Sequence, residues 1–198
     1  GSFIYTSKAN TKSRAGFPSS RSPSSTQTVN RSISFPVIGN ATERVSPMEL
    51  KQPKKLTLAG DWHGNLPWAF RAINHAKANG ADTILHLGDF GWWIPSEKTD
   101  QFLNELNAEL IHCNINLLWI DGNHEYHPSI PHGGEPWNLA RFSRITHLPR
   151  GYRWEWWGQT WMALGGAHSV DRLARTPGVD WWPEESLTVG QVHRACGP

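Results

Sequence analysis

Three short segments hold side chains suited to binding metal ions, and each of them directly follows an apolar run. The segments are Asp61-Trp62-His63-Gly64, Gly88-Asp89-Phe90-Gly91 and Gly122-Asn123-His124-Glu125. The preceding runs are short and end at a Gly or Asp turn signal, which predicts strands over Leu56–Ala59, Thr83–Leu87 and Ile115–Ile120. Strands that end in Asp, His and Asn, with helical segments between them, bring oxygen and imidazole ligands to one edge of a sheet. The sequence therefore predicts a metal centre assembled from residues far apart in the chain.

Such a centre suits the hydrolysis of phosphate esters. These esters resist hydrolysis because their phosphoryl oxygens repel nucleophiles and their leaving groups are poor. Two cations about 3.5–4 Å apart can neutralise the phosphoryl group, deprotonate a water molecule between them and hold both reactants in line. Such a pair needs a carboxylate that both cations share. Asp89, at the end of the second predicted strand, has the right type and position.

The first two blocks alone are typical of ordinary turns and Gly-Asn-His-Glu is rarer, but the three in this order resemble the calcineurin-like metallophosphoesterase family. The signature blocks of that family are Asp-x-His, Gly-Asp and Gly-Asn-His-(Asp/Glu). The resemblance implies a phosphatase, phosphodiesterase or nuclease in which Asp61 and His63 bind one metal and Asp89 bridges two. It also implies that Asn123 binds the second metal and that His124 protonates the leaving oxygen. The mixed ligands favour Mn, Fe, Zn or Ni over Mg or Ca, and the segments look like bacterial or phage members.

The chain departs from the family pattern at two places. Trp92 stands where many members have a second Asp in the Gly-Asp-x-x-Asp block. After Arg172 the chain has neither the further His nor the Gly-His-x-His block that complete both metal sites in the family. The resemblance therefore covers about residues 55–190 and predicts a C-terminally truncated domain. An inactive fragment, or a non-catalytic metal-binding or interaction module, stays open as the alternative.

A fourth segment, Gly165-Gly166-Ala167-His168-Ser169-Val170-Asp171-Arg172, is a candidate for substrate binding. Its two glycines allow the backbone to approach the site closely, and Arg172 can pair with a phosphate oxygen. The equally open alternative is a tight turn with a solvated His168 and an Asp-Arg pair. The other histidines have no partner at ligand spacing, which predicts structural or surface roles for His75, His86, His112, His127, His132, His147 and His193.

The positions of these residues require an α/β fold. From Lys54 onward the chain reads β-α-β-α-β, with one helix capped by Asn65 and ended by Gly80, and a second over Thr99 to His112. Helices between consecutive strands make right-handed crossovers, so the sheet is expected to be parallel. Two further elements are expected, a hairpin over Tyr152–Trp157 and Thr160–Leu164, and a short helix from Ser186 to about Arg194. The family resemblance implies a four-layer α/β/β/α sandwich, incomplete at the C-terminus.

The 198 residues suffice for a single domain, which we expect over residues 54–198. Residues 1–53 are rich in Ser, Thr, Arg and Pro without periodicity, which predicts disorder. Because Gly1 to Thr42 contains Lys and Arg but no Asp or Glu, an organellar transit segment is the alternative for this part.

Composition restricts the partners and the compartment. The net charge of +2 does not argue for nucleic-acid binding, so the expected partner is a phosphoester, with nucleic acid only as a substrate. No apolar run approaches the roughly 18 residues of a membrane span, and two cysteines favour a reducing, cytoplasmic compartment. The oligomeric state is open. Most of the twelve tryptophans are expected in the core, and some at a pocket wall.

Overall fold

The computed structural model describes residues 50–197. The disorder predicted for residues 1–53 therefore falls, for residues 1–49, outside the described part of the chain. The centre of the molecule is a parallel sheet in the order β1-β2-β3-β4. Its strands are β1 (Leu56–Ala59), β2 (Thr83–Leu87), β3 (Asn116–Ile120) and β4 (Ile145–His147). The first three were predicted, with β3 starting one residue later than expected. The sequence analysis missed β4, a strand of three residues that follows a long loop.

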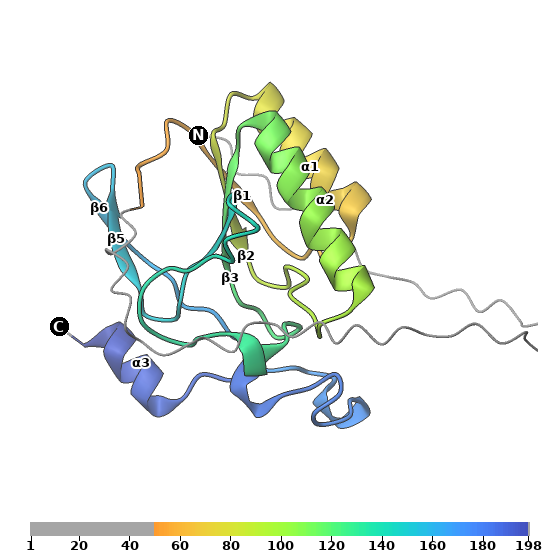
Figure 1. Ribbon diagram of the computed structural model, residues 1–198. Coiled ribbons are helices and arrows are strands. Elements are labelled where there is room, and N and C mark those ends of the chain that lie inside the picture. The colour runs from red at the N-terminus through yellow and green to blue at the C-terminus, as the bar shows by residue number, and fades with distance from the viewer. Residues whose placement is uncertain (1–49, 198) are drawn as a thin grey trace, which may run out of the picture.

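Two helices cover one face of this sheet (Figure 1). They are α1 (Leu66–Ala78) and α2 (Glu97–Cys113). As predicted, the Asn65 side chain caps α1, accepting a hydrogen bond from the backbone N–H of Trp68. The second helix begins two residues earlier than expected because Ser96 caps it in the same way, accepting from the N–H of Thr99. Between the helices and the sheet lies the larger apolar core, which includes Ile73, Ile84, Phe90, Leu103, Leu106 and Leu117.

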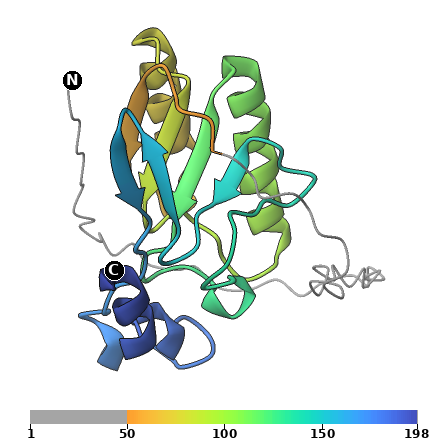
Figure 2. The same ribbon diagram turned by 90° about the vertical axis from the view of Figure 1, so that its left-hand side faces the viewer.

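The predicted hairpin covers the opposite face of the sheet (Figures 1 and 2). It consists of β5 (Arg153–Trp156) and β6 (Gln159–Met162). The hairpin starts one residue later and ends two residues earlier than expected, and its turn is at Trp157 and Gly158, one residue before the expected position. Trp154 and Trp156 pack with Leu85 and Leu118 of the parallel sheet in a second apolar cluster. Helices, parallel sheet and hairpin thus form three of the expected layers.

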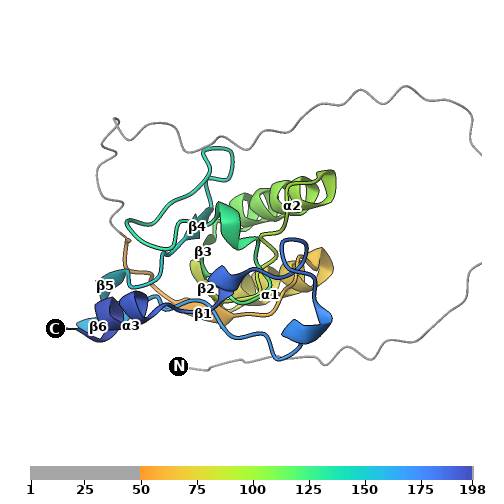
Figure 3. The ribbon, with the colours of Figure 1, turned by 90° about the horizontal axis from the view of Figure 1, so that it is seen from below.

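The last described segment runs across the carboxyl ends of the parallel strands, as the view from below shows (Figure 3). It contains the 3-10 helices η2 (Arg172–Ala174) and η3 (Pro183–Glu185) and the helix α3 (Val189–Cys196). The last helix starts later than predicted because Thr188 and Gln191 form a capping box at its beginning. It lies at the end of the hairpin and not across the hairpin's outer face (Figure 2). No helix within residues 50–197 has the length and apolar character needed to cross a bilayer.

Candidate metal centre

The loops that follow β1 and β2 are joined by backbone hydrogen bonds. The N–H of Asp61 donates to the carbonyl of Gly88 at 3.0 Å, and the N–H of His63 donates to the carbonyl of Asp89 at 2.8 Å. These bonds fix the two loops against each other at the carboxyl edge of the sheet. Three of the predicted ligands are therefore held by main-chain contacts as well as by their own side chains.

Backbone strain is concentrated at these same three residues. Asp61, His63 and Asp89 have φ values of 63°, 47° and 55°, in the left-handed region that non-glycine residues seldom adopt. Among residues 50–197 the other non-glycine positions of this kind are Asn114, the cap of α2, and Trp157 in the hairpin turn. Strain of this type persists only where the surrounding structure enforces it, and it is common at functional sites.

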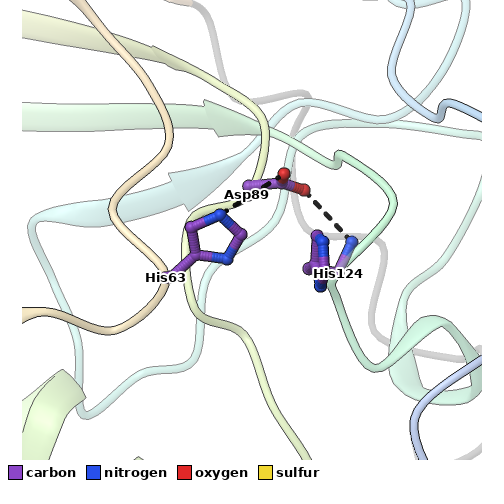
Figure 4. Close-up of side chains that lie close together, drawn as sticks. All are labelled: His63, Asp89 and His124. Atoms are coloured by element: carbon purple, nitrogen blue, oxygen red, sulfur yellow. Dashed lines mark hydrogen bonds and ion pairs between the residues drawn. The ribbon is translucent and has the colours of Figure 1, made fainter. Parts of the chain in front are cut away.

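The side chains of the first two blocks converge (Figure 4). His63 Nε2 lies 2.7 Å from Asp61 Oδ1 and 3.7 Å from Asp89 Oδ2. The rings of His63 and His124 are 4.7 Å apart and nearly perpendicular. One ligand atom each of His63, Asp89 and His124 lie within 4.8 Å of one another. Carboxylate and imidazole groups at this spacing fit a divalent transition metal.

The third block supports Asp89 from β3. The backbone N–H groups of Asn123 and His124 donate to Asp89 Oδ1 at 3.0 and 3.1 Å, while Asp89 Oδ2 faces His63. A Cβ atom at Gly122 would collide with the Asp89 side chain and would lie 2.5 Å from its backbone nitrogen. Only glycine at position 122 therefore allows this close approach of the two loops.

Asn123 is held by two residues that the sequence analysis did not identify as functional. Its Nδ2 donates to Ser169 Oγ at 3.0 Å, across 46 positions of sequence. The buried Glu185 of η3 accepts both the Ser169 N–H at 2.8 Å and the Ser169 hydroxyl at 2.5 Å. Because the hydroxyl proton goes to Glu185, the Ser169 oxygen is left to accept from Asn123. The Asn123 amide is thereby oriented with its oxygen available as a ligand.

Glu125, the last residue of the third block, joins the loop after β2 to the loop after β3 by buried hydrogen bonds. This fully buried carboxylate accepts the N–H of Phe90 at 2.5 Å and that of Gly122 at 2.6 Å. Burial, with the nearby charge of Asp89, raises the pKa of Glu125 to about 8, against the lowering effect of these hydrogen bonds. Glu125 therefore links the two loops that carry Asp89 and Asn123.

His124 is contacted by an arginine that the sequence analysis missed. Arg175 Nη2 donates to His124 Nε2 at 2.7 Å, and Arg175 Nε pairs with Asp171 at 2.9 Å. Burial lowers the pKa of His124; Asp89 opposes this, while Arg175 and His63 lower the pKa further. His124 is accordingly neutral near pH 7, with Nε2 as an acceptor.

The two predicted substrate residues lie on the segment that carries Arg175. His168 is exposed, and Arg172 is exposed with its guanidinium 5.2 Å from the Trp181 ring centre. Their role stays a prediction. A cavity of about 380 Å³ adjoins His63 and His124, and its aromatic walls are Trp93, Tyr126 and Trp182. A larger cavity of about 720 Å³ lies along β1 and reaches Asp61, Asp89 and Asn123.

The structure corrects the expectation that the remaining histidines lack partners at ligand spacing. His127 and His147 are buried, and His127 and His132 gather with Asp121 in a second group of potential ligands. Burial lowers the pKa of His127 to about 4 and also lowers those of His132 and His147. The sequence held one indication of this group, because Asp121 directly follows the third predicted strand.

Comparison with known families supports the likeness in sequence. The family model for calcineurin-like phosphoesterases matches residues 54–193. Among curated proteins, none matches the chain. The matched range contains all three sequence blocks and the segment with Arg172 and Arg175.

Proposed function

The chain belongs to the calcineurin-like phosphoesterase family, and from this we propose that it hydrolyses phosphoesters at a dinuclear metal centre. Membership of the family supports metal-dependent hydrolysis of phosphoesters. The use of two metal ions is the part that we add. One observation supports this part most strongly. Three of the five non-glycine residues with left-handed backbone in the described chain are Asp61, His63 and Asp89, and His63 Nε2 lies 2.7 Å from Asp61 and 3.7 Å from Asp89.

We assign the ligands as the sequence suggested. Asp61 and His63 would hold one ion, Asn123 would hold the other, and Asp89 would serve both. Divalent Mn, Fe, Zn or Ni at this centre would supply charge neutralisation of the phosphoryl group and activation of the attacking water. Asn123 adds a ligand without adding negative charge, which favours the approach of an anionic substrate.

His124 is proposed as the acid that protonates the leaving oxygen. Its Nε2 accepts from Arg175, and burial favours the neutral ring. A phosphate oxygen that enters the site competes for the Arg175 guanidinium and brings negative charge close to His124. Both changes favour the protonated ring, because a nearby anion stabilises the imidazolium and the Arg175 donor leaves Nε2. Substrate binding itself thus prepares His124 to donate a proton.

Arg175 is the residue that we add to the substrate site. Asp171 anchors its guanidinium through Nε and Nη2, and Nη2 also reaches His124, so a phosphate group that binds beside His124 would meet this donor. His168 and Arg172, on the same segment, are proposed as outer contacts to the substrate. The 380 Å³ cavity with its aromatic walls offers room for the organic part of the ester.

The test is the hydrolysis of nitrophenyl phosphate and bis-nitrophenyl phosphate by the purified chain with Mn²⁺. We expect turnover that is abolished by a chelator, restored by added Mn²⁺ and lost in Asp89→Asn. His112→Asn is the matched control, because His112 is exposed on α2, a helix that carries none of the proposed ligands. Metal binding without turnover of any ester would contradict the hydrolase and would favour the non-catalytic module.

A further inference from the structure

A group of buried polar residues lies beside the proposed active centre and takes no part in the chemistry described above. Asp121 follows β3, His147 ends β4, and η1 (His127–Ser129) and the loop after it contribute His127 and His132. From this arrangement we propose a separate structural metal site for zinc, with Asp121, His127 and His132 as ligands and His147 beside them.

The first argument is the number of polar atoms that lack a hydrogen bond. Within residues 50–197, Asp121 Oδ1 and both ring nitrogens of His127, His132 and His147 make no hydrogen bond of ordinary geometry, and His147 Nε2 approaches Asp121 Oδ1 only to 3.5 Å. Asp121, His127 and His147 are 2%, 1% and 0% exposed. Buried polar groups in folded proteins nearly always have a hydrogen-bond partner, so this concentration of unsatisfied atoms favours a bound ligand among them.

The second argument is the spacing of the atoms. One ligand atom from each of Asp121, His127 and His132 lie within 4.8 Å of one another. His147 Nε2 is 3.5 Å from Asp121 Oδ1, and His127 Nδ1 is 3.9 Å from Asp121 Oδ2. Ligand atoms around tetrahedral zinc are about 3.3 Å apart, given zinc–nitrogen distances of about 2.0 Å.

The third argument is the way in which Asp121 is held. Arg150 donates from Nε and Nη2 to Asp121 Oδ2 at 2.8 and 2.5 Å. The remaining acceptors of the guanidinium are the carbonyls of Glu185 and Ser186 and the side chain of Gln191. A hydrogen-bonded carboxylate with one oxygen free is the usual arrangement of a metal-ligating Asp. Arg150 thus orients Asp121 and leaves Oδ1 facing His147, while His127 lies beside Oδ2.

The donor set determines which metal fits. Two imidazole ligands and one carboxylate, with the His147 ring beside them, favour Zn²⁺ or Co²⁺ over Mg²⁺ and Ca²⁺, which prefer oxygen ligands. The positive charge of Arg150 opposes a second cation and lowers the affinity, although Asp121 compensates this charge. A bound ion would fasten η1 and its loop to β3 and β4, close to the segment that carries Asn123 and His124.

The test uses the full chain with Asp89→Asn, which weakens the proposed catalytic centre and leaves the second group intact. We expect this variant to bind one equivalent of Co²⁺ with the visible absorption bands of tetrahedral coordination, and Zn²⁺ to displace the Co²⁺. Added Zn²⁺ should also raise the unfolding temperature by mass action. Neither readout depends on catalysis, so failure of the proposed hydrolase would leave this test valid.

His132→Gln in the Asp89→Asn background is the decisive comparison. His132 is only partly buried and lies in a loop, so its replacement leaves the core residues in place. We expect the tetrahedral Co²⁺ bands and the Zn²⁺-dependent stabilisation to disappear, while the exposed His193→Gln keeps both. Equal Co²⁺ binding with and without His132, or no tetrahedral Co²⁺ in Asp89→Asn, would overturn the site and indicate that water satisfies these atoms.

Discussion

Asp89 connects the three loops of the candidate centre through different atoms. Its carbonyl accepts from the His63 N–H, Oδ1 accepts from the N–H groups of Asn123 and His124, and Oδ2 faces the His63 ring. A residue with this many contacts is fixed before any metal binds. The carboxylate at position 89 therefore has two roles. Its charge serves the metal site, and its hydrogen bonds hold the shape of the loop.

Asp89→Asn tests the role of this charge. Asparagine keeps the size and an oxygen for the backbone donors but removes the negative charge, so we expect Mn²⁺ affinity at the catalytic centre to fall by at least about 100-fold. Calorimetric titration measures the change. His112→Asn should bind Mn²⁺ as the native chain does, and equal affinities in all three proteins would refute the ligand assignment.

His124→Asn tests the proton donor. Loss of the acid should slow the hydrolysis of alkyl esters more than that of nitrophenyl esters, because nitrophenolate departs readily as an anion without being protonated. We expect the rate for alkyl phosphoesters to fall about 100-fold or more, the rate for nitrophenyl esters to fall much less, and metal content to change little. Rates that decline by the same factor for both kinds of ester would exclude the acid role.

At the scale of elements, the first three strands, both long helices and the hairpin could be predicted, because each has its own local pattern. The run Thr83–Leu87 is apolar and ends at Gly88, and Asn65 with Pro67 marks the start of α1. β4 has only three residues and owes its existence to pairing with β3. Local sequence carries no indication of such an element.

The same limit applies to the side chains around the site. Asp61, His63, Asp89 and Asn123 each follow a predicted strand, so their meeting at one edge could be predicted. Contacts with residues on the long final segment could not, because no periodic pattern places it. Ser169 meets Asn123 across 46 positions of sequence, and Arg175 meets His124 across 51.

Glu125→Gln tests how the loops are joined. Both oxygens of the Glu125 carboxyl group can accept a hydrogen bond even when the group is protonated, whereas the NH₂ of glutamine cannot and would face the N–H of either Phe90 or Gly122. Leaving that buried donor unsatisfied should lower the free energy of unfolding by about 1–3 kcal/mol, measured by urea denaturation. Glu97→Gln, at an exposed position, should change the free energy of unfolding by less than about 0.5 kcal/mol. No difference between the two variants would argue against Glu125 as the link.

At the scale of the whole molecule, the interior contains histidines that must stay neutral. His86 is fully buried in β2 between the rings of Trp62 and Phe90. Burial, with a smaller effect of His63, lowers the pKa of His86 from 6.5 to about 3. The folded state therefore binds fewer protons than the unfolded chain between these values. The resulting stability is present above pH 6.5 and is lost as the pH falls toward 3.

His86→Phe should reduce this acid sensitivity. Each proton that only the unfolded chain binds contributes a slope of about 1.4 kcal/mol per pH unit, and phenylalanine removes one such proton while keeping an aromatic ring. Urea unfolding between pH 7.5 and 5 gives the slope, with the exposed His112→Asn as control. A variant that loses stability on acidification as steeply as the native chain would exclude His86 as a source.

The most direct test of the central claim is a crystal structure of the chain with Mn²⁺, with the ions located by anomalous scattering. The proposed function predicts two peaks at the carboxyl ends of β1, β2 and β3, one contacting Asp61 and His63, one contacting Asn123, and both contacting Asp89. Crystals of Asp89→Asn grown with the same Mn²⁺ should lose these peaks. Native crystals with no anomalous peak at this edge, or with Mn²⁺ bound only elsewhere, would contradict a dinuclear phosphoesterase centre in this chain.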